Sequence, residues 1–164
     1  MGHSDKRLSV RLLTDPVHFL ALGFGSGLSP VAPGTCGTLV AIPLAIVLLH
    51  LPLALAVSLV GVTILGGIWI TGQSATRLGV HDHPGIVWDE IAAFLALVLV
   101  IPAGWAWIAL AFVFFRLFDI TKPWPIRDLD HRLQGGLGIM LDDLVAAVFA
   151  AVSVRFINYL MTLI

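Results

Sequence analysis

The segment 38–70 contains no Asp, Glu, Lys or Arg. It is too long for one bilayer crossing, which takes about 20 residues. Residues 50–52, His-Leu-Pro, interrupt the apolar run, and proline breaks a helix because it lacks an N–H group. We therefore expect a helical hairpin, with helices near 36–50 and 53–75 joined by a tight turn.

The composition agrees with a membrane environment. Hydrophobic residues make up 59% of the 164 residues and charged residues 12%, whereas about a quarter of a soluble domain is charged. This length allows one domain, 1–164, in which 1–16 form a cytoplasmic N-terminal arm. A net charge of -1 provides no basic field for nucleic acid, and the single cysteine, Cys36, excludes an internal disulfide.

The distribution of cations predicts the topology. Arg77 marks the polar stretch 71–90 as cytoplasmic by the positive-inside rule. The next apolar run, 91–115, is either one span or two short helices broken at 102–104, Pro-Ala-Gly. The loop after it carries four cations: Arg116, Lys122, Arg127 and Arg132. We choose two helices, because one crossing would leave these cations outside. Each arm would have roughly 14–17 residues, which undershoots a 30 Å hydrocarbon core.

With a last helix from about 138 to 163, we expect an all-α bundle of about five short transmembrane helices with two hairpins. Three helix ends on the cytoplasmic side carry five acids: Asp89, Glu90, Asp119, Asp142 and Asp143. Carboxylates that converge repel one another unless a cation lies between them, and hard oxygen ligands suit Mg²⁺ or Mn²⁺. We predict that Glu90, Asp89, Asp142 and Asp143 hold Mg²⁺. The alternative is that they are ordinary helix-end charges in contact with water.

Arg116 and Lys122 lie three residues before and three after Asp119. If the helix continues through Asp119, the three side chains share one face. Such a face is suited to binding phosphate, so we predict that these residues and Asp89 are catalytic. The alternative for both cations is that they extend to the membrane interface.

The glycine-rich segment 23–35, GFGSGLSPVAPGT, leads into the first long helix. With Thr35 or Thr38 as N-cap, the helix start would form an anion site, although the same composition also suits any tight turn. His81 is a candidate proton carrier. The predicted substrate-binding residues are Ser29, Pro33, Gly34, Thr35 and His81.

Four blocks carry a family resemblance: GFGSGLSPVAPGTCGTL, GVHDHPGIVWDE, FRLFDITKPWPI and QGGLGIMLDD. Through them nearly the whole chain resembles the phosphatidylglycerophosphatase A family. The resemblance implies a Mg²⁺-dependent enzyme of the bacterial cytoplasmic membrane that releases phosphate from phosphatidylglycerophosphate. The acidic motifs of the family fall on Asp89 with Glu90, on Asp119 with Lys122, and on Asp142 with Asp143.

Several alternatives stay open at this point. The nucleophile is either a metal-activated water or Asp119, which would form an aspartyl-phosphate. Intramembrane carboxylates also occur in ion and solute transporters, and a non-catalytic lipid-binding subunit would bind headgroups without turnover. The expected partners are a phospholipid substrate and the bilayer, with no nucleic acid; a homo-oligomer is compatible with the sequence.

Overall fold

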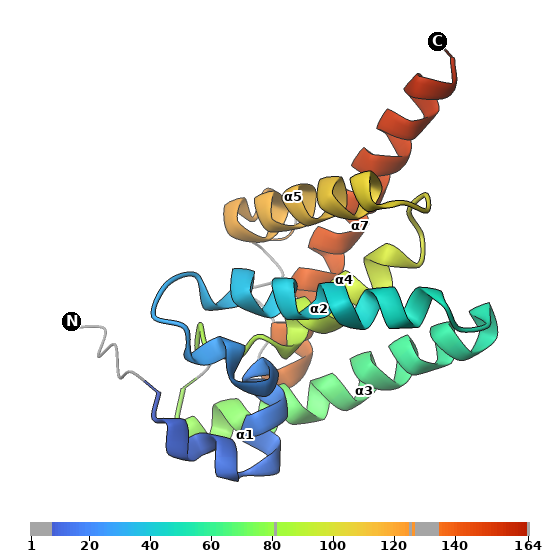
Figure 1. Ribbon diagram of the computed structural model, residues 1–164. Helices are drawn as coiled ribbons and strands as arrows, with labels where there is room; N and C mark the ends of the chain where they lie inside the picture. The colour runs from blue at the N-terminus through green and yellow to red at the C-terminus, as the bar shows by residue number, and fades with distance from the viewer. Residues whose placement is uncertain (1–7, 81, 125, 127–134, 164) are drawn as a thin grey trace.

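The computed structural model describes residues 8–80, 82–124, 126 and 135–163 (Figure 1). The elements of the described parts are helical, and none of these residues forms a strand. They are η1 (Val10–Thr14), α1 (Pro16–Ala21), η2 (Gly23–Leu28), α2 (Pro33–Leu49), α3 (Leu53–Leu78), α4 (Trp88–Val98), α5 (Trp105–Thr121) and α7 (Gly135–Thr162). The all-α prediction is confirmed.

Both predicted helix breaks are confirmed. The segment 50–52 separates α2 from α3, and 102–104 separates α4 from α5. Gly104 has φ 128° there, a backbone conformation that residues with a Cβ rarely adopt. At each break the chain reverses, so α3 returns beside α2 and α5 returns beside α4. The polar ends of these four helices therefore lie on the same side of the bundle, at the left in Figure 1.

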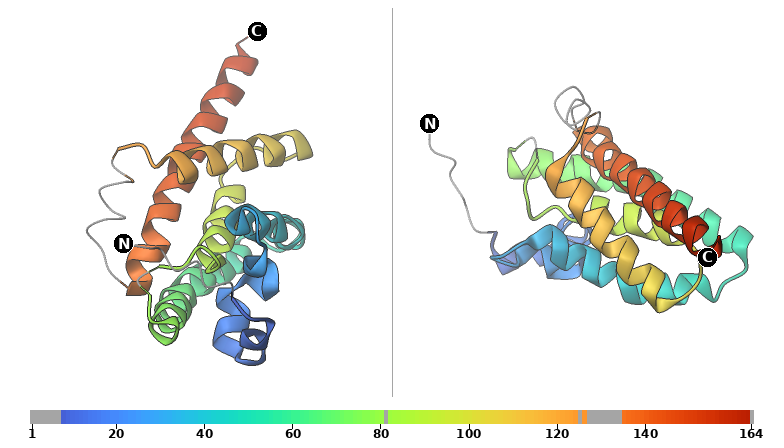
Figure 2. Two further views of the ribbon diagram at one scale, coloured as in Figure 1. Left: turned by 90° about the vertical axis from the view of Figure 1, so that its left-hand side faces the viewer. Right: turned by 90° about the horizontal axis from the view of Figure 1, so that it is seen from above.

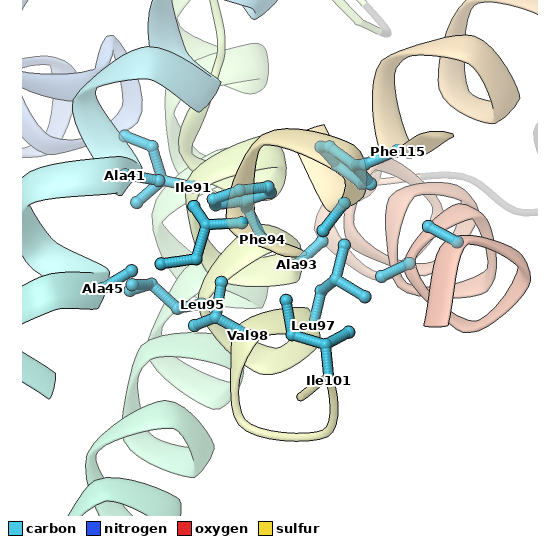
Figure 3. Packing of buried hydrophobic residues seen from close by; sticks show 14 of the residues in the cluster. Ala41, Ala45, Ile91, Ala93, Phe94, Leu95, Leu97, Val98, Ile101 and Phe115 are labelled. Atoms are coloured by element: carbon cyan, nitrogen blue, oxygen red, sulfur yellow. The ribbon is translucent and has the colours of Figure 1, made fainter. Parts of the chain in front are cut away.

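The short helix α4 forms the centre of the bundle. It contacts α2, α3, α5 and α7, and its residues Ile91, Ala92, Ala93 and Phe94 have no exposed surface. After Glu90 the helix has no polar residue, so it can be covered on every side. Figure 3 shows its apolar side chains packed between the alanines of α2 and Phe115 of α5. The start of α4 is therefore held in place by packing all around the helix.

The lengths of the helices limit how many of them cross a bilayer. Among the described residues, α3 and α7 are long and apolar enough to span one, and α2 is apolar but shorter. Helix α4 has 11 residues, about 16 Å at 1.5 Å per residue. The expected five spans are not confirmed. In Figures 1 and 2 the C-terminal part of α7 extends past the other helices.

The N-terminal segment packs against the polar end of α3. Asp15 caps α1 by accepting a hydrogen bond from the Val17 N–H at 2.8 Å and forms an ion pair with Arg77 at 2.6 Å. The Val17 N–H and the Arg77 guanidinium lower the pKa of the Asp15 carboxyl. Behind this exposed pair, His18 Nδ1 and Ser74 Oγ form a buried hydrogen bond at 2.9 Å. Of the expected arm 1–16, residues 1–7 lie outside the described residues, and 10–15 are part of this contact.

Close contact between α3 and α7 depends on Gly136. A Cβ at this position would lie 1.7 Å from the Ile68 carbonyl oxygen and 2.8 Å from the Gly72 nitrogen. The Thr71 hydroxyl donates to the Gly136 carbonyl at 3.4 Å. The Asp142-Asp143 pair follows about two turns later on α7, so this contact also sets where the pair lies.

We expect Gly136→Ala to destabilise the protein by about 1–3 kcal/mol, the usual cost of overpacking, because α7 must move away from α3. Gly66→Ala, on the partner helix α3, is the control: a Cβ there meets nothing within 4 Å, so it should be neutral or slightly stabilising. Unfolding of both variants in detergent, followed by circular dichroism, checks this. Equal stability of the two variants would contradict the close α3–α7 contact.

Candidate active site

A cavity of about 270 Å³ lies where the polar helix ends meet. It is bounded by the first turn of α2, the loop before α4, the start of α4, the end of α5 and one turn of α7. Six carboxylates line it: Asp82, Asp89, Glu90, Asp119, Asp142 and Asp143. Two cations, Arg116 and Lys122, line it as well. Segments far apart in the sequence thus converge on one charged site.

Asp89, Glu90 and Asp143 form a buried triplet in this cavity. One carboxylate oxygen from each lies within 4.8 Å of the other two, and each of the three residues is at most 8% exposed. Asp89 Oδ1, Glu90 Oε2 and Asp143 Oδ2 are buried and accept no hydrogen bond from the described residues. Buried polar atoms normally have partners. Hard oxygen donors that lack hydrogen-bond partners have the chemistry that a divalent cation requires.

Arg116 connects three helices beside the triplet. Its Nη1 lies 2.6 Å from Asp119 Oδ2 on α5 and 3.6 Å from Glu90 Oε1 on α4, and it donates to the Thr38 hydroxyl of α2 at 3.4 Å. Helix α5 does continue through Asp119, as the predicted shared face requires. The sequence analysis considered Thr38 only as a candidate N-cap and did not predict its contact with Arg116, because that contact joins two helices far apart in the sequence.

Lys122 approaches the site from just beyond α5. It is the C-cap residue of that helix, with φ 40°, and its Nζ lies 2.6 Å from Asp142 Oδ2. Asp142 therefore lies apart from the triplet, whereas all four acids were predicted as metal ligands. Consecutive residues of a helix point roughly 100° apart, so Asp142 faces the cation of α5 while Asp143 faces the carboxylates of α4.

The glycine-rich segment enters the site differently from the prediction. Helix α2 begins at Pro33 and its N-cap is Ala32, with φ 47°, so the expectation of Thr35 or Thr38 as N-cap was wrong. Proline is favoured at the first helical position because its missing N–H is not needed there. Pro33 and Thr35 nevertheless line the cavity.

The remaining predicted substrate residues fall in different places. Ser29 is not among the residues that line the cavity; its hydroxyl donates to the Val31 carbonyl at 2.8 Å. His81 lies outside the described residues. Its neighbour Asp82, which was not among the predicted site residues, does line the cavity. The charged run His-Asp-His before α4 was the only signal for it.

Gly34 lets α2 approach the carboxylates. A Cβ on Gly34 would lie 2.0 Å from Glu90 Oε1 and 3.0 Å from Arg116 Nη2. The sequence predicted Gly34 as a phosphate-binding residue on account of its exposed backbone. The structure adds a second requirement, since any side chain at this position would displace the Glu90 carboxylate.

The charges of the cavity define what it can bind. With all groups ionised, the six carboxylates exceed the two cations by four charges. A phosphate group alone would be repelled by this excess. A divalent cation on the triplet would offset two of these four charges, and the two basic side chains that line the same cavity would then be available to an anionic ligand.

The sequence matches the family model for Phosphatidylglycerophosphatase A over residues 19–158. The chain belongs to the phosphatidylglycerophosphatase A family. Phosphatidylglycerophosphatase A of Escherichia coli (strain K12) is 44% identical over 96% of this chain and 92% of its own length. That of Haemophilus influenzae is 44% identical over 91% and 93%. A putative phosphatidylinositol-3-phosphatase of Bacteroides thetaiotaomicron is 36% identical over 80% and 86%.

No solved structure matches the chain. Family membership confirms the resemblance carried by the four sequence blocks. It also confirms that the chain is an enzyme, a phosphatase.

We expect Gly34→Ala to lower phosphatase activity by about 100-fold, because a displacement of 1 Å at a reacting centre can cost that much. The protein should still fold, since the clash falls on a side-chain carboxylate. Gly61→Ala on α3, where a Cβ meets nothing within 4 Å, should retain full activity. Full activity of Gly34→Ala as well would show that Glu90 does not need its observed position.

Proposed function

We propose that this protein hydrolyses the terminal phosphomonoester of phosphatidylglycerophosphate to give phosphatidylglycerol and inorganic phosphate. The observation that carries the proposal is the buried triplet Asp89, Glu90 and Asp143 in the same cavity as two cations that are held by ion pairs. Two relatives that are 44% identical over nearly their whole length are named phosphatidylglycerophosphatase A, which supports the choice of substrate.

The proposed cofactor is Mg²⁺, held by Asp89, Glu90 and Asp143. The fit rests on their unpartnered buried oxygens and on the excess of negative charge in the cavity. When bound, the ion would neutralise charge on the phosphate and act as a Lewis acid. We propose that Asp142 holds Lys122 rather than the metal ion, because the two side chains form an ion pair at 2.6 Å.

Arg116 and Lys122 are proposed to bind the phosphate oxygens. Each is already held by a carboxylate at 2.6 Å, Arg116 by Asp119 and Lys122 by Asp142. Their side chains therefore lose little further freedom when the substrate binds, which favours the transition state. Guanidinium and ammonium groups both make strong charge-assisted hydrogen bonds to phosphate.

The proposed nucleophile is water. Its oxygen forms a bond to phosphorus as the bond from phosphorus to the glycerol oxygen breaks. Asp89, through the carboxylate oxygen that does not hold the ion, accepts the proton of the water. The departing glycerol oxygen takes a proton from solvent water, and Asp89 afterwards releases its own proton to solvent. Asp119 is less suited to attack, because its Oδ2 is held in the ion pair with Arg116 at 2.6 Å. We assign Asp119 to positioning Arg116.

We further propose a multi-pass arrangement in the bacterial cytoplasmic membrane with the cavity on the cytoplasmic side. Helices α3 and α7 would span the bilayer, and α2, α4 and α5 would complete about five membrane-embedded helices. The gathering of polar helix ends on one side of the bundle (Figure 1) and Arg77 at the same end of α3 support this orientation. A substrate phosphate at the headgroup level would then reach the cavity without crossing the membrane.

Phosphate release from phosphatidylglycerophosphate by the purified protein tests the proposal. We expect turnover with Mg²⁺, none with EDTA, and a loss of at least about 100-fold in Asp143→Asn, because even outer-shell partners of metal ligands cost 10–100-fold. Mg²⁺ should also raise the unfolding temperature of the wild type but not of Asp143→Asn. Asp15→Asn, which removes an exposed carboxylate outside the cavity, is the control and should behave as wild type.

Equal turnover with Mg²⁺ and with EDTA would refute the metal assignment. Absence of phosphate release under all conditions would refute the proposal that phosphatidylglycerophosphate is the substrate.

Acid quenching during turnover of ³²P-labelled substrate distinguishes the two nucleophiles. With water as nucleophile we expect no acid-stable phosphoenzyme. We also expect Asp119→Asn to raise KM more than it lowers kcat, because Arg116 loses its anchor. An acid-stable ³²P label on the wild-type protein that is absent from Asp119→Asn would instead identify Asp119 as the nucleophile.

A further inference from the structure

A second cavity, of about 300 Å³, is an apolar groove between α4 and α7. All its lining residues are apolar. Leu97 and Ala147 are buried and form its floor, whereas Val100, Val148 and Val152 are exposed along its edges. The groove therefore has a closed floor and an open side, and the small residue Ala96 of α4 leaves room within it.

This groove runs along the two helices that carry the carboxylate triplet. On α4, Ala96 lies seven residues after Asp89, two turns further along nearly the same face. On α7, Ala147 lies four residues after Asp143, one turn away. The groove residue Leu144 directly follows Asp143 on α7, so the groove begins near the charged cavity and leads away from it into the apolar part of the bundle.

The far end of the groove is closed by a contact between the same helices. Arg155 of α7 donates through Nε to the Val100 carbonyl, just past the end of α4, at 2.5 Å. Measured along α4 from Asp89 to Val100, the path is about 16 Å at 1.5 Å per residue. A ligand that starts at the triplet and follows the groove therefore has a polar head and one extended apolar tail.

We propose that this groove binds one acyl chain of the diacyl phospholipid whose phosphate occupies the charged cavity. The proposal rests on the proposed function, since it takes the same lipid as occupant. The nearness of the groove to the carboxylate triplet, on the same two helices, favours the chain of the substrate over that of a bulk lipid.

Moving a chain from bilayer to groove gains little hydrophobic free energy, because lipid tails are as apolar as the groove. The gain is packing and orientation: a chain held in the groove aims the headgroup at the triplet.

Filling the groove tests the proposal. Ala96→Leu and Ala151→Leu add side chains at two lining positions, and Ala109→Leu, at an exposed position of α5, is the matched control. Two substrates are compared with Mg²⁺ in detergent: diacyl phosphatidylglycerophosphate and its deacylated headgroup, glycerophosphoglycerophosphate. We expect the groove variants to lose about fivefold in kcat/KM on the diacyl lipid, equivalent to ~1 kcal/mol, and to match wild type on the deacylated compound. The control should match wild type on both.

Full activity of both groove variants on the diacyl lipid would overturn the proposal that the groove binds an acyl chain of the substrate. This outcome differs from failure of the proposed function, in which the wild type would release phosphate from neither substrate.

A labelling experiment on the wild type decides the matter even if a filled variant folds poorly. The probe is phosphatidylglycerophosphate with a diazirine in one acyl chain. We expect crosslinks on α7 around Val148 that unlabelled phosphatidylglycerophosphate suppresses and phosphatidylcholine does not. Crosslinks suppressed equally by both lipids would mean that a bulk lipid occupies the groove. Crosslinks confined to the other apolar groove, lined by Leu48 of α2 and Leu59 of α3, would also overturn the proposal.

Discussion

The rest of the structure must offset the electrostatic cost of holding three buried carboxylates close together. Asp89, Glu90 and Asp143 lie within 4.8 Å of one another, in a place where burial and mutual repulsion both disfavour their charged forms. Arg116 and Lys122 offset part of this cost through ion pairs with Glu90, Asp119 and Asp142. These pairs draw the ends of α4, α5 and α7 together, so the same contacts that compensate the charges also define the walls of the cavity.

The apolar body provides the rigidity that this site requires. Helix α4 is covered by four neighbouring helices, which fixes where its first turn places Asp89 and Glu90. Two glycines then set the approach of the neighbours: Gly34 brings α2 against the Glu90 carboxylate, and Gly136 brings α7 against α3. Packing at these two positions leaves no space for a methyl group, so adding one at either position would alter the site.

The molecule is divided into a charged end and an apolar body, and this division matches the two parts of a phospholipid. In the proposed function the charged end binds phosphate, while the body offers apolar grooves along α4. Because α4 contributes both to the triplet and to the groove beside α7, one short helix relates the position of a headgroup to the position of its chain. This relation explains why a small buried helix, rather than one of the long helices, lies at the centre of the bundle.

The sequence by itself determined the helices, the two breaks between them and the acids that gather at their ends. Those features follow from local properties: apolar runs, prolines that cannot continue a helix, and charges excluded from the runs. Tertiary structure alone decided that Asp143 joins Asp89 and Glu90 while Asp142 pairs with Lys122, that Asp82 lines the cavity, and that Gly34 lies against Glu90. The physical reason is that these contacts depend on how each helix is rotated and how closely it packs, and sequence spacing within one helix does not specify its orientation toward the next.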